Sequence, residues 1–312
     1  MRWGDFRRSD NVEDRTGNAP EGGGGGLPFG GMHIGGGALV ILVIVGMLFG
    51  INPFELLGML GGGDGGSVQV PPSQQAPPSQ TAPQGYGPQP RASTSPAPPG
   101  TADVRKDFSR AVLGDTEDVW GSVFKQMGQR YEPPKLVLYR GATRSACGRA
   151  NAAVGPFYCP ADRDLYLDTS FFNELASRFG APGEFAQAYV IAHEVGHHVQ
   201  NLLGTMGQFE AQMQRADERS ANALSVRLEL QADCYAGVWG FYAQKRGIID
   251  TKDVESGLRA AAAVGDDQIQ KRTTGQVVPE SFTHGSAEQR TRWFRTGLQS
   301  GDPRDCNTFS AR

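Results

Sequence analysis

The sequence lacks the features that mark nucleotide-binding and nucleic-acid-binding proteins. Its 312 residues contain no nucleotide-binding loop, no stripe of basic residues and no internal repeat. The 30 lysines and arginines are opposed by 33 acidic residues, and the net charge of −3 gives a polyanion no long-range attraction. The composition therefore argues against phosphate chemistry and against nucleic acid as a partner.

Cysteine is also scarce, and no two cysteines have the C-x-x-C spacing of a zinc knuckle. All four lie in the C-terminal part of the chain, as expected for disulfides on the extracytoplasmic side of a membrane. A local bridge between Cys147 and Cys159 would close a small loop, which would leave Cys234 to pair with Cys306. Four cysteines allow three pairings, and the sequence does not choose among them.

Three of the five histidines lie close together, and His193, Glu194 and His197 form an H-E-x-x-H motif. On a helix, residues four apart differ by only about 40° in direction, so both imidazoles reach one metal ion. Glu194 is then free to act as a general base on a water that the metal activates. His198 lies about 140° from His193, and we expect it at the surface or behind the metal ligands.

A catalytic zinc ion needs a third protein ligand besides two histidines. The best candidates are Glu229 and Asp233, which are four residues apart on a helix expected from about residue 210 to residue 245. One carboxylate would bind zinc while the other accepts the second ring N–H of a ligand histidine. The alternative is a solvated acidic pair, which is common on helices.

These motifs resemble those of the bacterial membrane-anchored putative neutral zinc metallopeptidase family. The similarity rests on the opening Met-Arg-Trp, on Asn-Val-Glu-Asp-Arg at 11–15, on one apolar span, and on His-Glu-Val-Gly-His-His and Glu-Leu-Gln-Ala-Asp-Cys. More distantly the chain is similar to gluzincins, in which a later glutamate is the third ligand and an aspartate four residues on supports a ligand histidine. The resemblance implies one Zn²⁺ per chain, with Glu229 as ligand and Asp233 as support.

His284 precedes a helix start in which Ser286 and Gln289 match a capping box. The run Thr-His-Gly-Ser is similar to Thr-His-Pro-Ser in prenyl-protein-processing peptidases, with Gly285 in place of proline. The resemblance implies that His284 stabilises the oxyanion formed during peptide hydrolysis. The alternative is a loop histidine that helps to cap the helix. We expect Arg290 at the surface, although it would also suit a contact behind the ligands or with a substrate carboxylate.

One apolar stretch predicts a membrane anchor. Residues 35–60 are almost all apolar or glycine and are long enough for one transmembrane helix. Four arginines precede the stretch and no lysine or arginine follows it before Arg91, which predicts a cytoplasmic N-terminus and an extracytoplasmic domain at the inner membrane. The four are Arg2, Arg7, Arg8 and Arg15. A cleaved signal peptide is the alternative, but the run starts far from residue 1 and no cleavage site dominates.

These features divide the chain into four parts: a cytoplasmic tail at 1–34, the transmembrane helix at 35–60, a linker at 61–101 and a metallopeptidase domain at 102–312. The linker is rich in glycine, proline, serine and glutamine and is expected to be disordered, because it cannot bury enough apolar surface to fold. We interpret it as a tether, with a polyproline ligand for a partner domain as the alternative.

The domain is predicted to be α+β and mainly helical, a zincin-like fold with a small sheet. Strands are expected at 135–139 and 164–168. Because the second strand is nearest to the H-E-x-x-H helix in sequence, we expect Leu165 to Leu167 to form the sheet edge that pairs with an extended substrate. Helices are expected at 104–113 and 117–127, with a cap at 115–116 between them, and at 171–179, 184–203, 210–245, 253–264 and 287–298.

The sequence thus predicts a membrane-anchored zinc endopeptidase acting on peptides or proteins, with zinc held by His193, His197 and Glu229. Glu194 would take a proton from the attacking water and return it to the leaving amine. One alternative is a catalytically silent, zinc-stabilised scaffold or binding protein of the envelope, which would have no use for Glu194. The other is a metallohydrolase of another amide, such as a cell-wall peptide. The sequence contains no motif for substrate specificity or oligomeric state.

Overall fold

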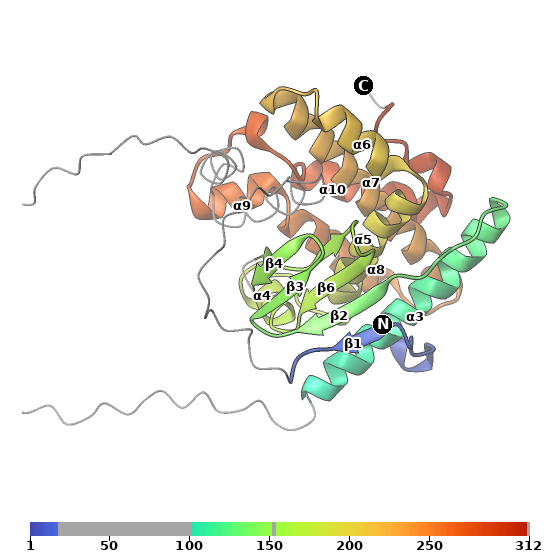
Figure 1. Cartoon of the computed structure of the whole chain (residues 1–312). Helices are drawn as coiled ribbons and strands as arrows, with labels where there is room; N and C mark the ends of the chain where they lie inside the picture. The colour runs from blue at the N-terminus through green and yellow to red at the C-terminus, as the bar shows by residue number, and fades with distance from the viewer. Residues whose placement is uncertain (18–100, 152–153, 311–312) are drawn as a thin grey trace, which may run out of the picture.

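The computed structural model describes residues 1–17, 101–151 and 154–310. Within these residues the chain forms eight α-helices and a small sheet, so the α+β, mainly helical prediction is confirmed. Figure 1 shows the sheet on one side of the domain and most of the helices on the other. The predicted transmembrane helix at 35–60 lies outside the described residues. None of the helices that are described has the length and apolar character needed to cross a membrane.

The main sheet has four strands in the order β1-β2-β6-β5. The strands β1 (Val12–Asp14), β2 (Lys135–Tyr139) and β6 (Asp164–Asp168) run parallel, and β5 (Phe157–Cys159) is antiparallel to β6. The two predicted strands are confirmed. The prediction that Leu165 to Leu167 form an edge is wrong, because β6 lies between β2 and β5. These residues are buried on both faces of the sheet, as is typical of an interior strand.

A hairpin of β3 (Ala142–Ser145) and β4 (Gly148–Asn151) lies beside the sheet. A disulfide between Cys147 and Cys159 joins the hairpin to β5. A second disulfide joins Cys234 to Cys306 and connects the longest helix with the end of the chain. Both bridges follow the pairing in which the first two cysteines close a local loop.

The first helix, α3 (Thr101–Gln126), is continuous, whereas the sequence predicted two helices separated by a cap. Asp115 does not cap a helix. Its buried carboxylate accepts hydrogen bonds from Trp239 Nε1 at 2.8 Å and from Arg246 Nη1 at 2.7 Å. Partners more than a hundred residues away therefore satisfy Asp115 inside the helix, which the local sequence does not reveal.

Four other helices begin and end close to the predicted positions: α4 (Phe171–Ser177), α5 (Glu184–Leu202), α8 (Thr251–Ala263) and α10 (Ala287–Ser300). The helix predicted at 210–245 is divided into α6 (Thr205–Met213) and α7 (Glu218–Lys245). Asp217 causes the division, because its side chain accepts the Ser220 N–H at 2.8 Å and starts a new helix. The short polar helix α9 (Asp266–Thr273) was not predicted.

Helices α5, α7 and α10 pack with their backbones in close contact at glycines. A Cβ atom on Gly297 of α10 would lie 1.9 Å from the carbonyl oxygen of Cys234, and one on Gly196 of α5 would lie 2.8 Å from that of Ala232. No side chain larger than hydrogen fits at these crossings. Both contacts fall on α7 within a few residues of Glu229 and Asp233.

Residues 1–17, which we call the N-terminal segment, pack against α3 and the sheet (Figure 1). The sequence predicted a tail outside the domain up to residue 34. Instead, β1 extends the sheet, and Ser9 is fully buried with its hydroxyl donating to Glu117 at 2.7 Å. The described part of this tail therefore belongs to the folded domain.

Candidate metal centre

The H-E-x-x-H motif lies on α5 and faces α7. His193 Nε2 is 3.2 Å from Glu229 Oε2, and His197 Nε2 is 3.4 Å from Glu229 Oε1. These three side chains are buried, and their ligand atoms all lie within 4.8 Å of one another. In the part of the chain that the structure describes, they form the one group of histidine, cysteine and acidic side chains close enough to share a metal ion.

The geometry of this group suits zinc. A tetrahedral zinc ion with bonds of about 2.0–2.1 Å to nitrogen and oxygen holds its ligand atoms roughly 3.4 Å apart. The two distances to Glu229 agree with this spacing. Two imidazoles and one carboxylate are also a donor set of catalytic zinc sites, in which a fourth position is left for water or substrate.

The outer ring nitrogen of each histidine contacts an acceptor that fixes the ring. His193 Nδ1 lies 2.9 Å from Asp233 Oδ1, and His197 Nδ1 lies 2.8 Å from Gln200 Oε1. Each Nδ1 therefore carries the proton, and each Nε2 lone pair is directed at the shared point beside Glu229. The structure places Asp233 where the resemblance to gluzincins implied. Gln200 was not identified from the sequence, although its position three residues after His197 on the same helix was a signal.

Arg290 is buried behind the ligands and not at the surface as predicted. Its Nε and Nη2 atoms donate to both oxygens of Asp233, at 2.8 and 3.0 Å. The Tyr189 hydroxyl donates to Asp233 as well. Arg290 Nη2 also lies 3.9 Å from Glu229 Oε2. One arginine thus faces two buried carboxylates, and a bound cation would balance the charge.

The pKa shifts of His193 and Glu229 also indicate that their surroundings stabilise a positive charge. Burial alone would lower the pKa of His193, but attraction and hydrogen bonding by Asp233 and Glu229 raise it to about 10. Burial would likewise raise the pKa of Glu229, yet His197 and His284 hold it well below its usual range. The surroundings of His193 therefore stabilise either a proton or a metal ion at this point.

Glu194 is half-buried and lines the same pocket as the three ligands, without being one of the group. Burial raises its pKa, an effect that His193 and His197 oppose. A carboxylate whose pKa is shifted toward neutrality is better matched to taking up and returning a proton.

The pocket above the ligands has an apolar wall, and residues 154–156 form part of its rim. Phe171, Phe179, Val190, Val264 and Ile269 line the wall. Residues 154–156 line another part of the pocket and lead directly into β5, which is an edge strand of the described sheet. The edge beside the pocket is therefore β5, in place of the predicted β6.

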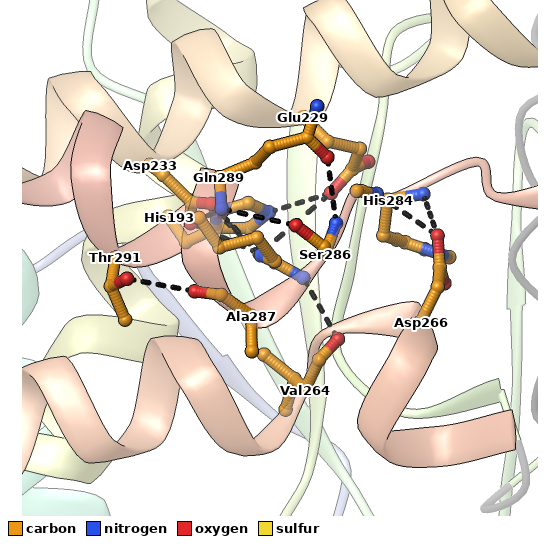
Figure 2. A network of polar contacts seen from close by, with 12 residues as sticks. His193, Glu229, Asp233, Val264, Asp266, His284, Ser286, Ala287, Gln289 and Thr291 are labelled. Atoms are coloured by element: carbon orange, nitrogen blue, oxygen red, sulfur yellow. Dashed lines mark hydrogen bonds and ion pairs between the residues drawn. The ribbon is translucent and has the colours of Figure 1, made fainter. Parts of the chain in front are cut away.

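His284 also lines the pocket, and Figure 2 shows it turned toward Asp266, with Glu229 between it and His193. Its Nδ1 lies 3.3 Å from Asp266 Oδ1. Burial lowers its pKa, but Glu229 and Asp266 outweigh that effect and the net direction is upward. The helix cap is formed by Ser286 and Gln289 through the predicted capping box, so the cap does not depend on His284.

Asp266 holds the loop that carries His284. Its Oδ2 atom accepts the backbone N–H groups of Thr283, His284 and Gly285 at 2.8, 2.7 and 2.9 Å. The side chain is buried, and it was not singled out from the sequence. An aspartate after a glycine is too common a pattern to reveal partners 17 to 19 residues away.

His198 is buried and contacts the sheet, away from the metal ligands. Its Nε2 donates to the Glu132 carbonyl at 2.6 Å, and its Nδ1 accepts from the Tyr158 hydroxyl at 3.2 Å. Burial lowers the pKa of His198 to about 4, so the ring is neutral at physiological pH. It joins α5 to β5. The expectation that His198 lies at the surface or behind the metal ligands is therefore wrong, because the ring is buried against the sheet.

The geometry agrees with what the chain is similar to. A family model described as "Putative neutral zinc metallopeptidase" matches residues 1–309. The uncharacterized protein YpfJ of Escherichia coli (strain K12) is 46% identical over 311 residues, which cover 99% of each chain. The uncharacterized protein Rv2575 of Mycobacterium tuberculosis (strain ATCC 25618 / H37Rv) is 46% identical over 221 residues, 67% of this chain and 73% of that protein. No solved structure matches the chain.

Proposed function

The chain belongs to the putative neutral zinc metallopeptidase family, and from this premise we propose that it is a zinc-dependent endopeptidase. One observation carries the proposal: Glu194 lines the pocket beside the buried donors of His193, His197 and Glu229. A zinc site that only stabilises a fold needs ligands alone. An additional carboxylate with a raised pKa, next to the ligands and facing a pocket, is what hydrolysis needs.

When bound, zinc supplies a Lewis acid that polarises the peptide carbonyl and makes water more acidic. Glu194 then accepts a proton from the attacking water and delivers it to the leaving amine. Asp233 and Gln200 keep the rings of His193 and His197 in orientation throughout.

His284 is proposed to stabilise the oxyanion that develops on the carbonyl. Its place on the pocket wall and its raised pKa suit a hydrogen-bond donor to a negative charge. The three backbone bonds that Asp266 accepts keep the loop of His284 in place before the reaction starts. Such a preorganised donor is worth about 3–4 kcal/mol in other hydrolases.

The substrate is proposed to be a peptide or protein in extended conformation. Residues 154–156 lead from the pocket into β5, an edge strand of the described sheet, and a peptide strand can pair with such an edge. The wall formed by Phe171, Phe179, Val190, Val264 and Ile269 would take a large apolar side chain next to the scissile bond.

The test is the Glu194→Gln variant, because the amide cannot accept the proton. We expect zinc content and fold to be unchanged and peptide cleavage to fall by about 10²–10⁴-fold. The measurement is cleavage of a peptide library and of an unfolded protein by the zinc-loaded enzyme, with Glu288→Gln at an exposed position of α10 as the matched control.

Equal cleavage by the parent and Glu194→Gln would contradict the proposal. A zinc-loaded parent that cleaves neither peptides nor unfolded protein would support the scaffold interpretation. A parent that hydrolyses only cell-wall peptides would support the alternative of a metallohydrolase that acts on another amide.

A further inference from the structure

The four arginines from which the membrane orientation was predicted all bind the folded domain. Arg7 Nη2 contacts Glu117 at 2.6 Å and Asp118 at 3.0 Å. Arg8 donates to both carboxylate oxygens of Asp107, at 2.9 and 2.6 Å. Arg2 donates to the Gly247 carbonyl, and Arg15 donates to the Thr143 hydroxyl and the Arg144 carbonyl.

Behind these arginines the N-terminal segment satisfies a buried carboxylate of the domain. Glu117 is only 7% exposed, and its Oε1 atom accepts from the Ser9 hydroxyl at 2.7 Å and from Asn11 Nδ2 at 2.8 Å. Arg7 is the cation beside the other oxygen. Without the segment, Glu117 would lose the three partners that make its burial tolerable.

The domain is also shaped to receive the segment. Gly114 lies in the middle of α3, and a Cβ atom there would lie 2.4 Å from the Arg7 carbonyl oxygen. β1 pairs with β2, with the Leu136 N–H donating to the Asn11 carbonyl at 2.8 Å. At the other end of the segment, Trp3 Nε1 donates to Glu184, the first residue of α5. The segment therefore touches the helix that carries the H-E-x-x-H motif.

We infer that residues 1–17 and the domain at 101–310 lie on the same side of any membrane that the chain enters. A single crossing between them would separate the two parts by about 30 Å of hydrocarbon and break every one of these contacts. The arginines are then docking residues and do not report a cytoplasmic N-terminus, although the orientation rule counts them. The chain from residue 18 to residue 100 begins and ends in one compartment.

This inference does not rest on the proposed peptidase activity, and its test needs none. All four cysteines form disulfides, so a cysteine introduced at an exposed position is the only reactive thiol. Two full-length variants are compared: Asp10→Cys in the N-terminal segment, where the side chain is 98% exposed, and Arg292→Cys on the exposed face of α10. Cells that produce each variant are treated with a membrane-impermeant maleimide before and after permeabilisation.

We expect both positions to behave alike, with both labelled in intact cells or both labelled only after permeabilisation. Labelling of one position and protection of the other in intact cells would overturn the inference. Cells that produce the parent, which has no free thiol, are treated in the same way, and their labelling sets the background.

A charge swap tests the docking itself in the purified full-length protein. Arg8→Asp and Asp107→Arg each replace an ion pair by two like charges, and each should lower the melting temperature by about 2–4 °C. The double variant restores opposite charges and should recover at least half of that loss. Additive losses would show that the two residues do not meet in the assembled protein and would overturn the inference.

Discussion

At the scale of single residues, the metal centre depends on Asp233, which is fully buried and accepts hydrogen bonds from His193, Tyr189 and Arg290. Burial raises the pKa of Asp233, but Arg290 and His193 lower it below its usual value. Asp233 therefore stays ionised and can hold His193 in the orientation that a metal ion requires.

We expect Arg290→Met to lower the free energy of unfolding by about 3–5 kcal/mol, because it leaves Asp233 buried without its cation. Urea unfolding measures the change. Arg292→Met, two residues along α10 and exposed, is the control and should change stability by less than about 0.5 kcal/mol. Equal stability of the two variants would mean that Arg290 does not neutralise Asp233.

His198 gives a prediction for acid. Its pKa is about 4 in the folded protein, below the usual histidine value of about 6.5, so the unfolded chain binds more protons between these values. The stability from the neutral ring is complete above about pH 6.5 and is lost as the pH falls toward 4, by at most about 3 kcal/mol. The measurement is urea stability from pH 7 to pH 4. His198→Gln keeps polar partners for Tyr158 and Glu132 without titrating, and a slope as steep as that of the parent would contradict the assignment.

At the scale of elements, the site depends on how closely α10 approaches α7. Gly237 of α7 and Gly297 of α10 face each other across the crossing, where a Cβ atom on Gly237 would lie 2.1 Å from the Phe294 carbonyl oxygen. This approach brings Arg290, near the start of α10, to Asp233. The two glycines thus help to set the position of Arg290 at the metal centre, although they lie further along the helices.

We expect Gly297→Ala to destabilise the protein by at least 1–3 kcal/mol, the usual effect of overpacking, because backbone atoms on both helices would have to move. Zinc affinity should fall as well, since Arg290 moves with α10. Gly121→Ala on α3 is the matched control, as its added Cβ meets nothing within 4 Å and should stabilise the helix by about 0.4–1 kcal/mol. Thermal unfolding and zinc competition with a chelating dye give both quantities. Unchanged zinc affinity in Gly297→Ala would refute the coupling.

At the scale of the whole molecule, the candidate ligands come from two helices that are far apart in the chain, since His193 and Glu229 are separated by 36 residues. Metal that binds only the folded arrangement stabilises it, by about 4 kcal/mol when free zinc is 1,000 times its dissociation constant. We therefore expect chelation to lower the melting temperature by roughly 8–16 °C. Scanning calorimetry with and without a chelator measures the shift, and Glu229→Gln should show much less of it.

The sequence predicted those residues of the site whose spacing matches the period of an α-helix. His193 and His197 share one helical face, and Glu229 and Asp233 share another, so spacing drew attention to these two pairs. The roles of Glu229 as ligand and Asp233 as support came from the resemblance to gluzincins. Arg290 and Asp266 could not be placed, because their burial depends on partners that only the tertiary fold brings near. The arginines of the N-terminal segment were counted as an orientation signal since a charge pattern does not distinguish a docked arginine from one in a loop.

The docked N-terminal segment also sets an order in time. Ser9 meets Glu117, a residue made 108 positions later, so at roughly 5–20 residues per second the first-made part of the chain waits about 5–20 s for its partner. During that interval Arg7 and Arg8 have not yet met their partners on α3, which are Asp107, Glu117 and Asp118. Once α3 has been made and has folded, Arg7 and Arg8 are paired with its carboxylates and no longer present unpaired charges to their surroundings.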